Sequence, residues 1–248
     1  MSDKFYKEAI DKLEKFLRSK RTEVMGLYGN IPHETKSHHN DVVTEMDKKL
    51  EREIRDLLEG IDPSIKIVGE EYGGEPGGTF WTVDPIDDTQ AFIRGLPYCS
   101  TMISLIVDDK PVLGVVYNFA LDNFYFAIDG KGAYCDGKVI HVSDRPIKKA
   151  YVRTHVNRKL INLLMDQGVF RVHLSGFVVD VARGAVDGYI TNGEMGEVWD
   201  YVPRAVIIRE AGGVVTNFGK DTYDWRDRSI VASAPTIHDQ LNSLADNL

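Results

Sequence analysis

Three carboxylates lie close together in this sequence, directly after a run that predicts a buried strand. The run is Phe80–Val83, which is apolar and β-branched, and the carboxylates are those of Asp84, Asp87 and Asp88. The next residues, Thr89–Ile93, favour a helix for which Asp87 or Asp88 is a natural N-cap. Hard divalent cations prefer carboxylate oxygens, and anions favour helix N-termini. The spacing therefore predicts a joint cation and phosphate site, although Asp-Pro-x-Asp-Asp is also typical of an ordinary capped turn.

Two further places add carboxylates at the ends of predicted elements. Glu70 and Glu71 follow the apolar run 65–68, which predicts a second strand. Asp200, after a tryptophan, stands at the start of another helical pattern. Pro85 is expected to end the strand that precedes the first cluster, because proline fixes φ and lacks the N–H donor of a sheet ladder.

Together these motifs resemble the inositol monophosphatase family, the magnesium-dependent, lithium-sensitive phosphatases that also include archaeal fructose-1,6-bisphosphatases, histidinol phosphatases and phosphoadenosine phosphatases. The matching stretches keep the family's order and spread over most of the chain: Asp41-Val42-Val43-Thr44-Glu45-Met46-Asp47, Gly69-Glu70-Glu71, Asp84-Pro85-Ile86-Asp87-x-Thr89, and Trp199-Asp200 with Glu210-Ala211-Gly212-Gly213. Each stretch is a weak signal alone, and their joint order is a strong one. The resemblance implies the inositol monophosphatase and fructose-1,6-bisphosphatase type of fold, an α/β layered sandwich (α/β/α/β/α).

The resemblance also implies a magnesium centre with two to three Mg²⁺ ions. Its oxygen donors would be Glu70, Asp84, the carbonyl of Ile86, Asp87 and Asp200, with Asp84 bridging two ions. Two ions roughly 4 Å apart can generate hydroxide and stabilise the leaving alkoxide of a phosphate monoester. Ligation by oxygen alone favours magnesium over zinc.

Further roles around the ions follow from the same resemblance. Glu71 would take the proton of the attacking water, and Thr89, hydrogen-bonded to Asp47, would help to orient that water. The backbone N–H groups of Asp88 and Thr89 would hold phosphate oxygens. Without the resemblance, Asp47 is most simply one of the surface charges of a helix, together with Lys48, Glu51 and Arg55.

Two loop residues complete the implied site. Glu194 resembles a family glutamate that contacts substrate hydroxyls, although a solvated loop glutamate fits equally well. Lys36 takes the place of a mobile-loop lysine near the metals.

The sequence departs from the family pattern at three places. Asp88 stands where the family has glycine, which adds negative charge beside the expected phosphate site. A Gly-Ser/Thr-Ala turn is missing near 172–176, and Tyr201-Val202-Pro203 replaces small alanines. Pro203 is expected to lie in a first helical turn, where proline is tolerated.

Periodicity over the rest of the chain predicts an α/β layered sandwich. Apolar positions at helical spacing predict helices over 5–27 and 41–58, and alternation over 100–139 predicts an antiparallel meander with Asp108, Asp109 and Asp122 in its turns. Strands and helices then alternate: strands at 151–154, 170–173, 187–191, 214–217 and 229–232, and helices at 157–167, up to about 183, at 200–210 and after 235. A connector at 145–150 predicts tightly coupled parts, 1–146 and 147–248.

Composition limits the class of protein. A formal net charge of −8 argues against a nucleic-acid partner, and no apolar run approaches the length of a membrane span. Cys99 and Cys135 make no CxxC pair and are interpreted as reduced core residues, which together with a charged N-terminal sequence favours the cytoplasm. The resemblance implies a homodimer.

These observations predict a magnesium-dependent phosphomonoesterase that acts on a small polyol or sugar phosphate. Inositol-1-phosphate and fructose-1,6-bisphosphate are the leading substrates. The stretches 92–97 and 111–115 are also similar to histidinol phosphatases, so histidinol phosphate and phosphoadenosine phosphate stay open as alternatives. An alternative of another class is a catalytically weak homologue that binds metal and phosphate for regulation, and Asp88 is its motivation.

Overall fold

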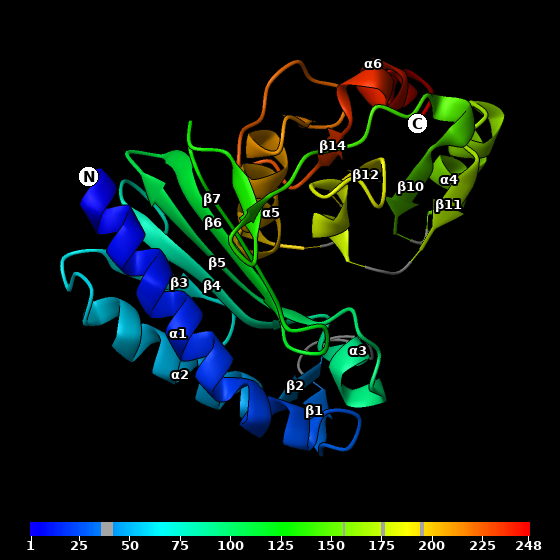
Figure 1. Ribbon diagram of the computed structural model, residues 1–248. Coiled ribbons are helices and arrows are strands. Elements are labelled where there is room, and N and C mark those ends of the chain that lie inside the picture. Colours follow the sequence, from blue (N-terminus) through cyan, green and yellow to red (C-terminus); the bar gives the residue numbers. More distant parts are fainter. Residues whose placement is uncertain (36–41, 156, 175–176, 194–195) are drawn as a thin grey trace. The chain divides into compact units, whose positions relative to one another are not determined.

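A computed structural model describes residues 1–35, 42–155, 157–174, 177–193 and 196–248 (Figure 1). The chain divides into two compact units, Met1–Phe126 and Ala127–Leu248. The predicted connector at 145–150 lies inside the second unit. Within the described part of the chain, no helix combines the length and the apolar character that a membrane crossing requires.

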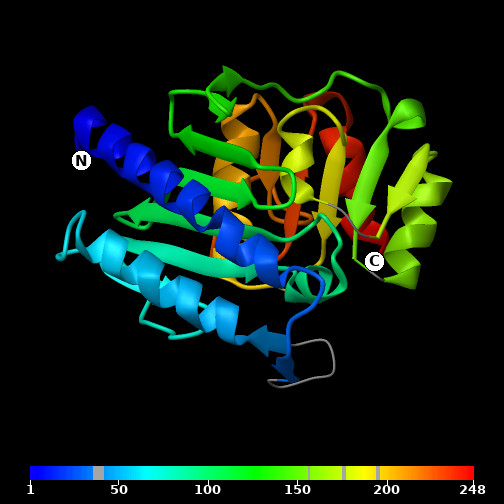
Figure 2. The same ribbon diagram turned by 60° about the horizontal axis from the view of Figure 1, so that its bottom comes forward.

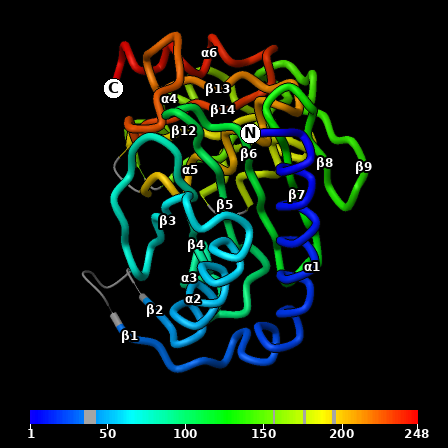
Figure 3. Tube along the Cα trace, turned by 90° about the vertical axis from the view of Figure 1, so that its left-hand side faces the viewer, coloured from blue at the N-terminus to red at the C-terminus, as the bar shows by residue number. Residues whose placement is uncertain are grey.

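The first unit is a sheet with helices on one face. Its elements are α1 (Asp3–Leu27), β1 (His33–Thr35), β2 (Val42–Thr44), α2 (Glu45–Glu59), β3 (Lys66–Gly69), β4 (Phe80–Asp87), α3 (Thr89–Arg94), β5 (Ser100–Val107) and β6 (Lys110–Asn118). Strands β3 and β4 pair in parallel, whereas β4 with β5 and β5 with β6 pair antiparallel. Helices α1 and α2 lie side by side against the same face of this sheet (Figures 1, 2 and 3). A further strand, β7 (Asn123–Ile128), spans the boundary between the units.

The apolar stripe predicted on the first helix is the face that α1 buries. Ala9, Leu13, Leu17 and Val24 are fully buried along it. Removing such side chains from water supplies the main driving force for packing an amphipathic helix on a sheet. The helix predicted over 5–27 is confirmed.

Helix α2 begins later than its sequence pattern suggested. The expected start at residue 41 is wrong, because Val42–Thr44 forms β2, which pairs antiparallel with β1. Thr44 is the N-cap, and its hydroxyl and Asp47 form a reciprocal capping box. Three β-branched residues in a row favour the strand over the helix at this point.

Strand β4 also differs from the prediction, since Pro85 does not end it. Asp84 pairs with Met102 and Asp87 pairs with Ser100, so three steps along β4 oppose two along β5. This irregularity is a bulge, one of the few places where a sheet accepts proline. The Thr101 hydroxyl donates a hydrogen bond to the Pro85 carbonyl at 2.6 Å and holds the bulged backbone.

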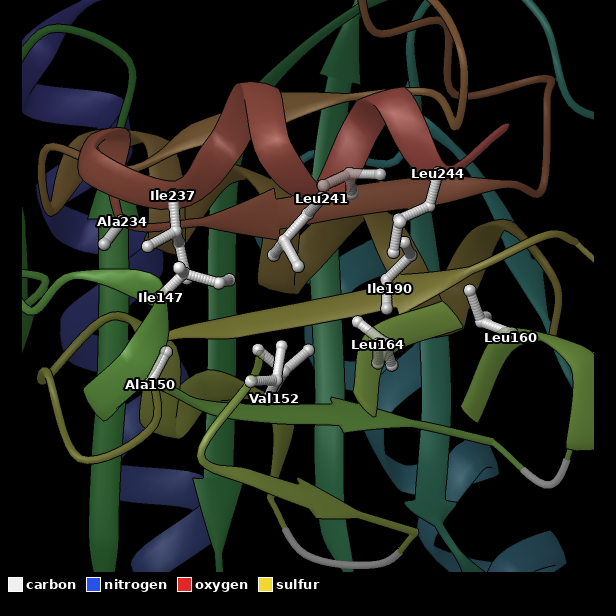
Figure 4. Packing of buried hydrophobic residues seen from close by; sticks show 12 residues of the cluster. Ile147, Ala150, Val152, Leu160, Leu164, Ile190, Ala234, Ile237, Leu241 and Leu244 are labelled. Atoms are coloured by element: carbon white, nitrogen blue, oxygen red, sulfur yellow. The ribbon is translucent and has the colours of Figure 1, made fainter. Parts of the chain in front are cut away.

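The second unit contains a mixed sheet of five strands in the order β11-β10-β12-β14-β13. Its elements are β8 (Ala133–Cys135), β9 (Lys138–Val139), η1 (Ile147–Lys149), β10 (Tyr151–Thr154), α4 (Arg158–Asp166), β11 (Arg171–His173), η2 (Val178–Val181), β12 (Gly188–Thr191), α5 (Val198–Glu210), β13 (Val214–Thr216), β14 (Ile230–Ser233), η3 (Pro235–Ile237), α6 (His238–Asn242) and η4 (Ser243–Asn247). Side chains from α4 and α6 meet Val152 of β10 and Ile190 of β12 in one core cluster (Figure 4).

Two expectations for this unit are corrected. In the segment expected to be helical up to about 183, the described residues from 177 on form the short 3-10 helix η2 followed by turns instead of an α-helix. Pro203 is the sixth residue of α5 rather than part of its first turn. It therefore removes one intrahelical hydrogen bond from the helix interior, and α5 continues to Glu210 despite this.

Candidate functional site

The parallel pairing of β3 and β4 brings two candidate ligands to the same end of the sheet. Gly69 is opposite Val83, so the next residues, Glu70 directly after β3 and Asp84 within β4, lie side by side. The backbone N–H of Glu70 donates to the Val83 carbonyl at 3.0 Å, which fixes this juxtaposition. Asp84 is buried, with 1% of its surface exposed. Asp87 is half-buried at the end of β4.

Asp88 forms the turn between β4 and α3. Its backbone is left-handed, with φ 57° and ψ 57°, a conformation that glycine adopts readily and that aspartate tolerates better than most residues. Its carboxylate accepts a hydrogen bond from the backbone N–H of Ala91 at 3.0 Å. The side chain is therefore the N-cap of α3, as the sequence predicted. The left-handed backbone also gives a physical reason for the glycine that the family resemblance implies at this position.

The hydrogen bond expected between Thr89 and Asp47 is present. The Thr89 hydroxyl lies 3.1 Å from Asp47 Oδ1 and 3.0 Å from the Ile86 carbonyl. Asp47 Oδ2 accepts from the backbone N–H of Thr44 at 2.9 Å and from the Thr44 hydroxyl. Asp47 is fully buried, so the simpler interpretation of this residue as a surface charge is wrong.

Burial controls the protonation of Asp47. Loss of hydration raises the pKa of Asp47 to about 6, the negative charge of Glu71 acts in the same direction, and the hydrogen bonds from Thr44 and Thr89 oppose the rise. The Asp47 carboxyl consequently changes its charge within the pH range in which enzymes are assayed. The charge of this carboxyl decides whether the Thr89 hydroxyl donates a hydrogen bond to it or accepts one from it.

The candidate ligands of the first unit form a set that suits a divalent cation. Glu70, Asp84 and Asp87 contribute carboxylates, and Ile86 contributes a backbone carbonyl from the same bulged turn. Carboxylate and carbonyl oxygens are the donors that Mg²⁺ prefers. Cys99, packed close to Asp87, does not compete as a ligand, because burial raises the pKa of its thiol to about 12. Both cysteines are free, as expected, but Cys135 is only half-buried.

The remaining predicted residues belong to other parts of the chain. Asp200 lies in the first turn of α5 in the second unit, where its carboxylate accepts from the backbone N–H of Glu197 at 2.6 Å. Lys36 and Glu194 lie outside the described residues, as does the end of the stretch 172–176.

One residue that the sequence analysis assigned to the helix surface is central to this region. Glu51 of α2 is fully buried, and its carboxylate accepts a hydrogen bond from the backbone N–H of Glu71 at 2.7 Å. A signal for it exists in the sequence, because Asp47, Glu51, Ile54 and Leu58 recur at helical spacing and share the buried face of α2. A carboxylate within an apolar stripe is a candidate buried anchor.

Comparison with known proteins gives a consistent result over the whole chain. The model of the "Inositol monophosphatase family" matches residues 4–248. Inositol monophosphatase 2 of Solanum lycopersicum is 34% identical over 230 residues, 84% of this chain and 86% of the relative. A Thermotoga maritima protein named fructose-1,6-bisphosphatase/inositol-1-monophosphatase is 30% identical over 245 residues, 94% of each chain.

A solved structure agrees with these relatives. An IMPase of Thermotoga maritima matches with a TM-score of 0.89 and 28% identity, over 97% of each chain. The match covers both units, and the α/β layered fold expected from the sequence is confirmed.

Proposed function

The chain belongs to the inositol monophosphatase family, whose members are phosphatases, and we propose that it hydrolyses the phosphate monoester of a small polyol or sugar. The leading substrates are inositol-1-phosphate and fructose-1,6-bisphosphate. The Thermotoga maritima relative, whose printed name combines both activities, supports this choice. The observation that carries the proposal is the pairing of β3 with β4, which brings Glu70 beside Asp84 at one end of the sheet.

The proposed metal ligands are the oxygen donors that the family resemblance implies. Glu70, Asp84, the carbonyl of Ile86 and Asp87 come from the first unit, and Asp200 comes from the start of α5. Two to three Mg²⁺ ions held there would supply an acidified water and neutralise charge on the leaving oxygen.

The residues around these ligands would manage the attacking water. The Thr89 hydroxyl has a single hydrogen, and an ionised Asp47 draws that hydrogen toward Oδ1. The lone pairs of the hydroxyl then remain available to accept a hydrogen from the water and so orient it. Glu71 is the proposed base that takes the other proton. Below about pH 6, a protonated Asp47 would donate to Thr89 instead and occupy one of those lone pairs.

The phosphate and the substrate complete the proposal. The backbone N–H groups of Asp88 and Thr89, at the start of α3, would hold phosphate oxygens. Glu194 would contact substrate hydroxyls, and the loop containing Lys36 would lie near the metals. The resemblance to the family further supports a homodimeric assembly.

The test is phosphate release with Mg²⁺ over inositol-1-phosphate, fructose-1,6-bisphosphate, histidinol phosphate and phosphoadenosine phosphate, each titrated with Li⁺. Turnover of one of the first two, lost with EDTA and inhibited by Li⁺, is the expected result. Turnover of histidinol phosphate or phosphoadenosine phosphate alone would keep the chemistry and replace the substrate. Turnover that persists in EDTA would contradict the metal-dependent mechanism.

The presence of Asp88 favours a second candidate function, that of a homologue that binds metal and phosphate ligands for regulation. Its exposed carboxylate adds negative charge at the start of α3, beside the proposed phosphate donors. Mg²⁺ binding measured by calorimetry, together with silence over the whole substrate panel, would favour this candidate. Turnover comparable to that of related phosphatases would exclude it.

A further inference from the structure

The turn that carries Glu70 and Glu71 is held by a buried carboxylate of the neighbouring helix α2. Glu51 lies in the middle of α2 and has no exposed surface. Its Oε2 accepts a hydrogen bond from the backbone N–H of Glu71 at 2.7 Å, and its Oε1 accepts from the backbone N–H of Tyr72 at 3.3 Å. The helix thus binds the backbone of the proposed base directly.

The other backbone donors of the turn have different acceptors. Gly69 and Gly73 exchange reciprocal N–H to carbonyl bonds, each at 3.0 Å, and the N–H of Glu70 donates to β4. The two backbone donors at the tip, those of Glu71 and Tyr72, bond to the Glu51 carboxylate. Because buried or half-buried backbone N–H groups need acceptors, Glu51 determines where the tip lies.

Arg55 completes this arrangement one helical turn later. Its Nε donates to Glu51 Oε1 at 2.8 Å, and its Nη2 donates to the Gly73 carbonyl at 2.5 Å. The guanidinium compensates the charge of the buried carboxylate and fixes its rotamer. Glu51 and Arg55 therefore contact both sides of the turn, and we call this pair the α2 brace.

Gly69 provides independent support, because it leaves the space that the brace occupies. A Cβ at this position would lie 2.0 Å from Glu51 Oε1 and 2.9 Å from Arg55 Nη2. The backbone of Gly69 does not have a positive φ, so the need for glycine is one of space and not of conformation. The strand approaches α2 closely enough for the brace to form only without a side chain here.

We propose that Glu51 is a positioning residue of the catalytic centre, which holds the Glu71 carboxylate and its neighbour Glu70 in register with Asp84 without touching the substrate. This inference rests on the proposed function, in which Glu71 is the base. Glutamine at position 51 has a single acceptor oxygen, and its NH₂ group would face one of the backbone donors at the tip. The turn would then lose at least one of its two anchoring bonds.

The experiment compares Glu51→Gln with Glu53→Gln in the full chain. Glu53 lies on the same helix and pairs with Lys20 at 2.8 Å, so the control makes the same chemical change away from the turn. We measure amide hydrogen exchange by NMR in metal-free protein, Mg²⁺ affinity by calorimetry, and kcat and KM separately.

For Glu51→Gln we expect exchange at the amides of Glu71 and Tyr72 to accelerate about tenfold or more, since loss of a hydrogen bond lowers the local opening free energy. Mg²⁺ affinity and kcat should fall by about 10- to 100-fold, with KM changed by less than about threefold. Glu53→Gln should stay within about twofold of the wild type in every measurement. If Glu51→Gln does not fold, Arg55→Lys decides, because lysine keeps the charge but lacks the planar guanidinium through which Arg55 donates to Glu51 and Gly73.

The outcomes separate the brace from the proposed function. Unchanged exchange at Glu71 and Tyr72 would overturn the inference, and so would an unchanged kcat in a folded Glu51→Gln protein. If the wild type hydrolyses none of the panel substrates, the proposed function fails. Faster exchange together with weaker Mg²⁺ binding in Glu51→Gln would then still establish that the brace positions the ligands.

Discussion

Each unit of this protein buries acidic side chains completely, and the two units use them differently. In the first unit, Asp47 and Glu51 accept hydrogen bonds from Thr89 and from the backbone of Glu71, both of which belong to the candidate site. In the second, Asp187 accepts from Arg145 Nε and from the backbone N–H of Tyr151, each at 2.7 Å, and from Ser143.

The difference lies in what each carboxylate holds. Asp187 joins the connector before β10 to the start of β12, where the sequence offers no candidate ligand or base. A buried, well-bonded acid is therefore a sign of an anchor, and only the anchored segment tells whether the anchor serves catalysis. This distinction between functional and purely structural anchors can be tested directly.

The largest effect is expected at Asp84, which the proposed function places on the metals themselves. Asp84→Asn keeps the size of the side chain and removes its negative charge, so kcat/KM should fall about a thousandfold, equivalent to ~4 kcal/mol of transition-state stabilisation. Steady-state phosphate release measures this loss, and circular dichroism controls for folding. A variant with activity within tenfold of the wild type would refute the metal assignment.

The next effect is on stability and concerns the structural anchor of the second unit. Asp187→Ala removes the acceptor of Arg145, Tyr151 and Ser143, which should lower the free energy of unfolding by about 3 kcal/mol. Urea unfolding measures this change. Activity per folded molecule should stay within about twofold, and a large fall in kcat would break the contrast between the units.

Asp47 should give the metal-free protein a characteristic pH dependence. Since the folded pKa of Asp47 is about 6 and its ordinary value is 3.8, the folded state holds this proton more tightly than the unfolded chain. The stability contribution is therefore present below about pH 4 and is lost as pH rises toward 6, by about 3 kcal/mol. Asp47→Asn should abolish this part of the dependence, measured by urea unfolding in EDTA between pH 4 and 7.5. An unchanged profile would show that another group is responsible.

The smallest effect is expected at Asp88, an exposed acid that caps a short helix. Asp88→Gly relieves a left-handed backbone and removes the bond to Ala91, two changes of opposite sign, so stability should change by less than about 1 kcal/mol. Inorganic phosphate should bind a few fold more tightly, because a negative charge is lost beside the proposed donors. Calorimetry with phosphate tests this, and weaker binding would contradict the placement of phosphate at this turn.

The sequence predicted the parts of the site that depend on local order. The end of β3 before Glu70, a cap at Asp87 or Asp88 and the helix start near Asp200 follow from periodicity and spacing, and the resemblance to a family supplied the bond between Asp47 and Thr89. The predictions that were wrong concern features that depend on segments far away in the sequence. Whether Glu51 is exposed is decided by the approach of the strand at Gly69, which α2 alone does not encode.

The prediction that Pro85 ends the strand was wrong for the same reason, since the continuation of β4 depends on how β5 pairs with it. Proline suggests that a strand ends when only its own sequence is considered. The partner residues Met102 and Ser100, together with the bond from Thr101, allow β4 to continue through Pro85.

That bulge also changes the parity of the strand. Side chains alternate between the two faces of a sheet, so positions three apart in a regular strand point in opposite directions. Met102 and Ser100 are two apart and share a face, and their partners Asp84 and Asp87 must therefore share it too. The extra residue shifts the alternation of the side chains by one position. Without the bulge, Asp84 and Asp87 would be three residues apart in a regular strand, and their carboxylates would point to opposite faces of the sheet.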